Sequence, residues 1–193
     1  MKKLILLFTF CLVITLFIAI MPTEAEGNIY HDTVRLHIIA NSDNENDQEL
    51  KLYIRDKLLS KYSSELVGYT SKSEAEKHLS TKLTNIKDDV EKWIFESGYN
   101  YDVEICLNTE WYETRAYDDF SLPCGYYTSL RIIIGEGVGQ NWWCVLYPPM
   151  CLGAATDLDN AVLNYTDKEI HLITDGKYRI KFKLLEIISS ALS

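Results

Sequence analysis

The chain has 193 residues, 47% of them hydrophobic, and a formal net charge of -9 at pH 7. This length gives one domain with a proper core and is short for two. The acidic balance disfavours nucleic-acid phosphates and anionic lipid headgroups as partners, because no stripe of Lys and Arg offsets it locally. We therefore expect no nucleic-acid partner.

The N-terminus has the pattern of an export segment. Two lysines precede an apolar run over residues 4–21, and polar residues follow. We expect residues 1–25 to be a signal peptide cleaved after Ala25 or, because a run of about eighteen apolar residues also just reaches the length that spans a bilayer, an N-terminal membrane anchor. The functional domain, residues 28–193, would then be secreted or tethered on the far side of a membrane.

The first element of that domain is a strand. Apolar residues alternate from Thr33 to Ala40, the two-residue period of a strand with one strongly buried face. The strand ends at the sequence NSDN, whose last residue, Asn44, suits the N-cap of a helix. Leu50, Ile54 and Leu58 then recur every four residues, which predicts an amphipathic helix over about 45–62.

A second helix follows with clearer boundaries. Ser71 and Glu74 form a capping box, and apolar residues continue at spacings of three and four as far as Trp93. Gly98 suits the left-handed residue that ends a helix. Residues 68–70 would connect the two helices.

Beyond Gly98 the period changes to two, which predicts strands. Val103, Ile105 and Leu107 share one face of a strand that continues towards Tyr117. Residues 126–134 and 142–147 are rich in aromatic and β-branched residues and also predict strands. We expect these last two to pair as a hairpin across residues 135–141, and a closing helix over about 179–192.

This order of elements predicts the fold class. We expect a single α+β domain with a mainly antiparallel sheet, two N-terminal helices and a C-terminal helix, preceded by the export segment. No repeat or low-complexity tract interrupts it.

Three alternating glycines, Gly135, Gly137 and Gly139, raise the question of a phosphate-binding loop. Such a loop needs its amides to converge at the start of a helix, whereas a β-rich, tryptophan-containing segment follows here. We interpret the glycines as residues that permit positive φ in a long turn.

Four cysteines follow the export segment, in a compartment where disulfides persist. We expect Cys144 and Cys151 to form a structural bridge around the Pro148-Pro149 pair. Cys106 and Cys124 are further disulfide candidates, which either pair or leave a free thiol; alternatively all four are reduced and buried.

Catalysis and metal binding have little support in the sequence. A cysteine hydrolase needs a thiolate activated by an imidazole, and no nucleophile signature surrounds any cysteine. There is no C-x-x-C or H-x-x-x-H spacing for a metal. We therefore expect no catalytic residues, metal, cofactor or small-molecule substrate.

Adjacent tryptophans, Trp142 and Trp143, face opposite sides of a strand. One can fill the core while the other faces outward as a binding anchor with polar neighbours, since tryptophan often dominates binding energy. The alternative is that both pack beneath the tail.

Two blocks of sequence are similar to a known family. The first is VRLHIIANSDNENDQELKLYIRDKLL (34–59), with its Ala-Asn-Ser-Asp turn and Asp-Gln helix. The second is TRAYDDFSLPCGYYTSLRIIIGEGVGQNWWCVLYPPMC (114–151), with Thr-Arg-x-Tyr, Leu-Pro-x-Gly and Gly-Glu-Gly-x-Gly-Gln-Asn-Trp-Trp-Cys-Val. Together they closely resemble stage II sporulation protein R of endospore-forming bacteria.

The resemblance implies a signalling role. Proteins of this family are made in the forespore and exported across its membrane into the intermembrane space. There they signal to a membrane-embedded aspartic protease of the mother cell, which matures an early mother-cell sigma factor. The family brings no established catalytic residues to this chain.

We therefore expect a non-enzymatic, exported activator of that receptor protease, with membrane contact only through the N-terminal segment if it is uncleaved. The candidate receptor-contact residues are Tyr117, Arg131, Glu136, Gln140, Asn141, Trp142 and Trp143. The alternative function is an exported Cys-His hydrolase at the envelope, and a third is a structural module of the wall or membrane.

Overall fold

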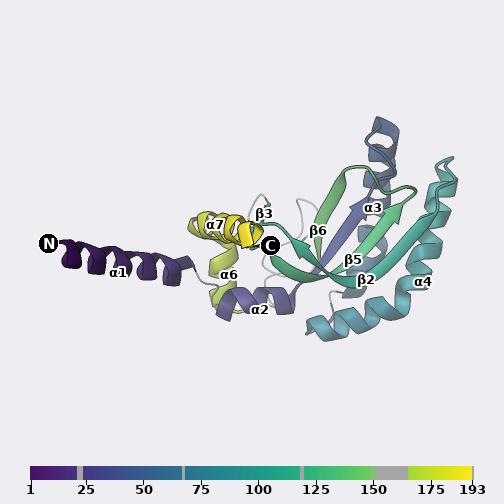
Figure 1. The fold of residues 1–193 in the computed structure, drawn as a ribbon. Helices are drawn as coiled ribbons and strands as arrows, with labels where there is room; N and C mark the ends of the chain where they lie inside the picture. Colours follow the sequence, from purple (N-terminus) through teal and green to yellow (C-terminus); the bar gives the residue numbers. More distant parts are fainter. Residues whose placement is uncertain (21–23, 67, 118–119, 149, 151–164, 193) are drawn as a thin grey trace. The chain divides into compact units, whose positions relative to one another are not determined.

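The computed structural model describes residues 1–20, 24–66, 68–117, 120–148, 150 and 165–192 (Figure 1). They form two compact units. The sheet unit comprises Tyr30–Trp111 and Tyr126–Thr166, and the terminal unit comprises Met1–Ile29, Tyr112–Gly125 and Asp167–Ser193.

The sheet unit is built on four strands in the order β2-β5-β1-β6 (Figure 1). These are β1 (Val34–Ile39), β2 (Val103–Tyr112), β5 (Gly125–Ile134) and β6 (Asn141–Tyr147). Strand β1 runs parallel to β5 and antiparallel to β6. The Gly135 amide donates to the Asp102 carbonyl over 2.9 Å, so the end of β5 lies beside the start of β2, as in an antiparallel pair. The predicted α+β class with a mainly antiparallel sheet is confirmed.

The predicted hairpin between residues 126–134 and 142–147 is wrong, because β1 lies between β5 and β6. All six residues of β1 are buried, as expected of a central strand flanked on both sides. The connection from β5 to β6 therefore spans two strand spacings, about 10 Å, instead of one. A long glycine-containing loop is what this crossing requires.

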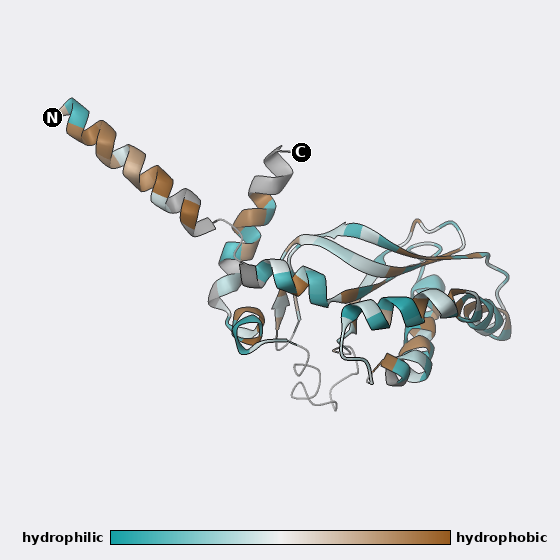
Figure 2. Cartoon of the chain, turned by 90° about the horizontal axis from the view of Figure 1, so that it is seen from below, coloured by the Kyte–Doolittle hydropathy of each residue, from teal (hydrophilic) through white to brown (hydrophobic). Residues whose placement is uncertain are grey.

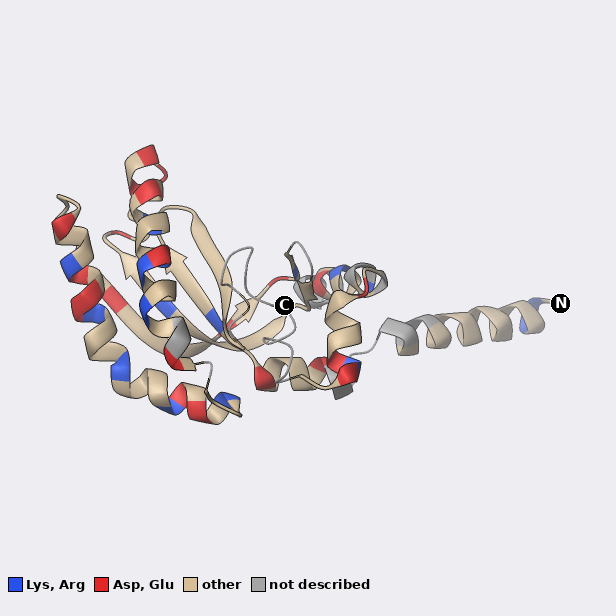
Figure 3. Ribbon diagram, turned by 180° about the vertical axis from the view of Figure 1, so that it is seen from behind, with Lys and Arg blue, Asp and Glu red and all other residues tan. Residues whose placement is uncertain are grey.

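Two helices cover one face of the sheet. They are α3 (Glu45–Leu66) and α4 (Lys72–Glu96), and both contact β1 (Figure 2). Their apolar residues and the helix-facing residues of the strands form one core cluster, which includes Leu36, Ile38, Leu50, Ile54, Ile86, Leu130 and Ile132. Acidic and basic residues are interspersed along both helices (Figure 3).

Three of the predicted helix ends, at Asn44, Ser71 and Gly98, are confirmed. The Asn44 side chain accepts from the Asp47 amide over 2.9 Å, and the Ser71 side chain accepts from the Glu74 amide over 3.3 Å. Gly98 has φ 86°, in the left-handed region that favours glycine. Helix α3 is one turn longer than the sequence predicts, ending at Leu66.

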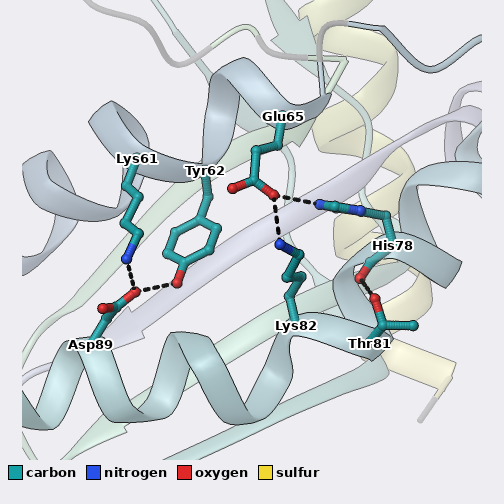
Figure 4. A network of polar contacts seen from close by, with 7 residues as sticks. All are labelled: Lys61, Tyr62, Glu65, His78, Thr81, Lys82 and Asp89. Atoms are coloured by element: carbon teal, nitrogen blue, oxygen red, sulfur yellow. Dashed lines mark hydrogen bonds and ion pairs between the residues drawn. The ribbon is translucent and has the colours of Figure 1, made fainter.

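Polar side chains join α3 to α4 where the two helices face each other (Figure 4). Asp89 of α4 accepts from the Tyr62 hydroxyl and pairs with Lys61 at 2.5 Å. Glu65 of α3 lies 2.7 Å from Nε2 of His78. Burial, followed by the bond to Asp89, raises the pKa of Tyr62 well above its usual range, so its hydroxyl keeps its proton.

The terminal unit contains shorter elements. A two-stranded hairpin pairs β3 (Arg115–Ala116) with β4 (Ser121–Leu122). Among its described residues, the helices α1 (Lys2–Ile20), α6 (Asp167–Thr174) and α7 (Lys177–Leu192) lie wholly within it, and α7 confirms the predicted closing helix. Lys181 of α7 pairs with buried Glu26 at 2.9 Å.

A further helix, α2 (Glu24–Asp32), crosses the predicted cleavage point after Ala25 and was not expected from the sequence. Within the described part of the chain, no helix has both the length and the apolarity needed to cross a membrane. The export segment and the boundaries of the functional domain remain predictions.

Candidate functional site

The loop between β5 and β6 passes over the end of β1, and its glycines are explained by that close approach. Gly135 and Gly137 have φ of 60° and 63°. A Cβ at Gly135 would lie 2.2 Å from Oδ1 of Asn41, and one at Gly139 would lie 2.3 Å from the Ser42 carbonyl oxygen. Positive φ at two positions confirms part of the sequence interpretation; the packing against the Asn41 turn was not expected.

Hydrogen bonds donated by backbone amides tie this loop to the turn after β1. The Glu136 amide donates to Oδ1 of Asn41 over 3.0 Å, and the Gly139 amide donates to the Ala40 carbonyl over 3.0 Å. The Gln140 amide donates to Oδ1 of Asp43 over 2.7 Å. These amides are engaged within the protein, so they do not form an anion-binding cradle.

Asp47, at the start of α3, holds the turn of residues 41–44 in place by hydrogen bonds. Its Oδ2 accepts from Asn41, Ser42 and Asn44 at 2.8, 2.6 and 3.2 Å, and its Oδ1 accepts from the Tyr101 hydroxyl at 2.9 Å. The residue is only 2% exposed. Burial alone would raise its pKa, but the hydrogen bonds outweigh burial and hold the pKa of Asp47 below its usual value.

The face of the sheet opposite α3 and α4 is polar near its centre. In β1, Leu36 and Ile38 point into the helix-facing core, so Arg35 and His37 point to the other face. His37 lies in register with Arg131 of β5 on one side and Trp143 of β6 on the other. Three strands thus place a cation, an imidazole and an indole in one row.

His37 is held on three sides. Its Nδ1 lies 3.3 Å from Oε2 of Glu110, and its Nε2 lies 3.0 Å from Oδ1 of Asn141. Its ring stacks on that of Trp143, with centroids 3.7 Å apart and an interplanar angle of 22°. Each ring nitrogen of His37 therefore has a polar partner.

Glu110 is the acidic member of this cluster. Burial would raise its pKa, but hydrogen bonds with His37 and Ser129 and the nearby charge of Arg131 outweigh burial and lower it. Glu110 is therefore a carboxylate at neutral pH. We call His37, Glu110, Arg131, Asn141 and Trp143 the central cluster.

The candidate contact residues are divided by the fold. Arg131, Asn141 and Trp143 come together in the central cluster, whereas Glu136 and Gln140 lie in the loop over β1. Trp142 points to the other face, where it packs against the core and under the Arg55 guanidinium, whose Cζ lies 4.2 Å from the ring centroid. The prediction that the tryptophans face opposite sides is confirmed.

Tyr117 belongs to the terminal unit, where its ring stacks on Phe120 with centroids 4.5 Å apart. Sequence reasoning did not place His37, Glu110 or Asp47 among the candidate contact residues. His37 sits within an alternating strand, and the two carboxylates are among many in an acidic chain. The signal that could have indicated His37 is a titratable residue inside a strand otherwise rich in apolar residues.

The structure does not support a disulfide between Cys106 and Cys124, one of the pairings expected from the sequence. Cys106 and Cys124 are free thiols, so they do not pair with each other. They belong to different units, and the Cys124 thiol instead lies 3.8 Å from the Phe182 carbonyl of α7. Cys144 is buried in β6 and disulfide-bonded, but Cys151 lies outside the described residues, so the Cys144–Cys151 pairing remains a prediction.

Neither free thiol has the environment of a nucleophile. Burial raises the pKa of Cys106 and also that of Cys124, so both favour the protonated form at neutral pH. Among the described residues, no group of three or more acidic, His or Cys side chains is placed to hold a metal ion.

Comparison with known proteins gives one consistent result. The family described as Stage II sporulation protein R matches residues 30–157. The Stage II sporulation protein R of Bacillus subtilis (strain 168) is 36% identical over 138 residues, which are 70% of this chain and 60% of that protein. The aligned region thus spans less than two thirds of the relative's length. No solved structure matches the chain significantly.

Proposed function

The chain belongs to the Stage II sporulation protein R family, and from this premise we propose that it is an exported signal that activates a membrane-embedded aspartic protease of the mother cell. Membership in the family supports a role in sporulation. The proposed consequence of activation is proteolytic maturation of an early mother-cell sigma factor.

The observation that carries the proposal is the extent of the family match. Residues 30–157 include all four strands of the sheet, both covering helices and the loop over β1. The two sequence blocks that resemble the family meet in one substructure, where the loop amides bond to the Asn41 turn beside the central cluster. A rigid surface of this kind suits recognition.

The proposed site of action is the space between the two sporulation membranes. The lysine-flanked apolar segment at the N-terminus supports export, with the chain either released by cleavage or tethered by that segment. The proposed partner is the receptor protease, and we propose no nucleic acid or small-molecule substrate. The net charge of -9 supports the exclusion of a nucleic-acid partner.

The Cys-His hydrolase is the weaker candidate. It requires a thiol of lowered pKa beside an imidazole, whereas burial raises the pKa of both Cys106 and Cys124. The two ring nitrogens of His37 face Glu110 and Asn141. These contacts favour a positioning role for His37.

The test is to express the full chain in sporulating cells that contain the receptor protease and the pro-sigma factor but lack their own protein of this family. Processing is followed by immunoblot, with the chain's abundance and export measured in parallel. We expect processing to be restored. An abundant, exported chain that leaves the sigma factor unprocessed would refute the proposal.

A further inference from the structure

Strand β2 forms one edge of the sheet, and its outer side pairs with no other strand among the described residues. Its register against β5 identifies which groups face outward. The bond from the Gly135 amide to the Asp102 carbonyl fixes the start of the pairing. Continued along the strands, this pairing would place Trp111 opposite Tyr126, whose rings meet edge to face with centroids 5.1 Å apart.

In the register set by this bond, residues alternate along β2 between the side that faces β5 and the free edge. Asp102 directs its carbonyl towards β5, and every second residue after it does the same. The amides and carbonyls of Ile105, Leu107, Thr109 and Trp111 therefore face the free edge. An edge of this kind is a template for pairing with another chain.

The side chains along this edge indicate which kind of strand could pair with it. On the helix-facing side, Ile105 and Leu107 are only partly buried and Trp111 is 40% exposed, which leaves apolar surface for cross-strand contacts. On the polar side, Asp102 and Glu104 are exposed, and no Lys or Arg occurs between residues 93 and 114.

A second copy of this chain fits the edge poorly in the register that pairs all of its outward-facing residues. If two β2 strands paired antiparallel over their outward-facing residues from Val103 to Trp111, Glu104 of each copy would lie opposite Glu110 of the other. Like charges directly opposite each other destabilise a strand pair. The charge pattern favours a basic partner strand.

We propose that the outer edge of β2 is the docking site for an extended, basic segment of the partner, which adds a fifth strand to the sheet. Backbone hydrogen bonds would supply affinity, and alternating apolar and basic side chains would supply specificity at Trp111 and Glu104. For the identity of the partner, this inference rests on the proposed function.

The first experiment uses the unaltered full chain and two end-blocked ten-residue peptides, one alternating Lys and Val and the other alternating Glu and Val. Hydrogen exchange of the Leu107, Thr109 and Trp111 amides is measured with each. We expect the Lys peptide at saturation to slow exchange of these amides at least about tenfold, because each becomes hydrogen-bonded, and the Glu peptide to have no effect. Unprotected amides with both peptides, or equal protection by both, would overturn the inference.

The second experiment compares Thr109→Pro with Thr109→Ala in the full chain. Thr109 is exposed, and proline there removes one outward amide while alanine keeps it. We expect Thr109→Pro to bind the Lys peptide about tenfold more weakly than Thr109→Ala and to lose sigma-factor processing. Equal binding by two folded variants would overturn the inference.

If Thr109→Pro does not fold, the exchange measurement on the unaltered chain decides. If the Lys peptide protects the edge while the unaltered chain fails to restore processing, the edge site is supported and the proposed function is the part that fails.

Discussion

His37 and Trp143 lie directly opposite each other on β1 and β6, and their rings stack with centroids 3.7 Å apart. The imidazole is almost completely buried, while the indole is only partly so. Trp143 thus stacks on His37, which Glu110 and Asn141 hold in place by hydrogen bonds. An aromatic ring fixed in this way is a suitable binding anchor, since little side-chain entropy is lost on binding.

Replacing Trp143 by alanine should separate binding from stability. We expect Trp143→Ala to reduce sigma-factor processing at least about 30-fold, as for a binding residue worth about 2 kcal/mol or more. Trp142→Ala should instead lower the free energy of unfolding by about 3 kcal/mol, because Trp142 packs on the core. Phe95→Ala, at a residue 75% exposed on α4, is the aromatic control. Normal processing by Trp143→Ala at normal abundance would remove this residue from the receptor surface.

Asp47 should make stability depend on pH. Its folded-state pKa is lowered, so its contribution is fully present above its unfolded-state pKa of about 3.9 and is lost as the pH falls through the folded-state value. We expect Asp47→Asn to reduce the free energy of unfolding at pH 7 by about 2–4 kcal/mol, because a buried carboxylate that accepts four hydrogen bonds is removed. The difference from the unaltered chain should shrink at pH 3.

Urea unfolding at both pH values measures this effect. Asp88→Asn, at an exposed position of α4, is the matched control and should change stability little at either pH. An Asp47→Asn chain as stable as the unaltered one at pH 7 would contradict the role given to this carboxylate.

The loop over β1 should not tolerate a side chain at Gly139. A Cβ there would lie 2.3 Å from the Ser42 carbonyl oxygen, a backbone atom that cannot move alone. We expect Gly139→Ala to destabilise the chain by about 1–3 kcal/mol. Gly68→Ala is the control, because a Cβ at Gly68 meets nothing within 4 Å. Equal melting temperatures for the two variants would show that the close approach of Gly139 to Ser42 does not contribute to the free energy of unfolding.

The two free thiols of the functional domain, on half-buried Cys106 and buried Cys124, should react slowly in the folded chain. Burial raises the pKa of Cys106 and of Cys124, so little thiolate is present at pH 7.5. In a Cys11→Ser background, which removes the exposed thiol, we expect alkylation by iodoacetamide to be at least about tenfold slower than in urea, since both burial and the raised pKa limit it. Rapid labelling of either thiol in the folded chain would revive the hydrolase hypothesis.

Local signals in the sequence predicted the helices well. Asn44, Ser71 and Gly98 mark helix ends by short-range chemistry, and each performs the expected role. The opposite orientation of Trp142 and Trp143 follows equally from the two-residue period of a strand. These features depend on neighbouring residues alone.

Strand order depends on distant residues and was predicted wrongly. The alternation in β1 indicates one buried face, yet Arg35 and His37 on the other face are buried as well. That burial reflects the position of β1 between β5 and β6, which no local pattern records. Three members of the central cluster were candidates from the sequence, but His37 and Glu110 were not joined to them for the same reason, because the five residues come from four different strands.

The position of β1 between β5 and β6 also affects how the chain folds as it is made. The middle strand leaves the ribosome early, but neither of its hydrogen-bonding neighbours exists until synthesis has passed Gly125, and the second is complete only at Tyr147. Contacts between such distant residues close slowly. In a chain that ends before Asn141, the backbone groups of β1 that face β6 therefore have no partner strand. The four-stranded sheet can form only after residues 141–147 have been made.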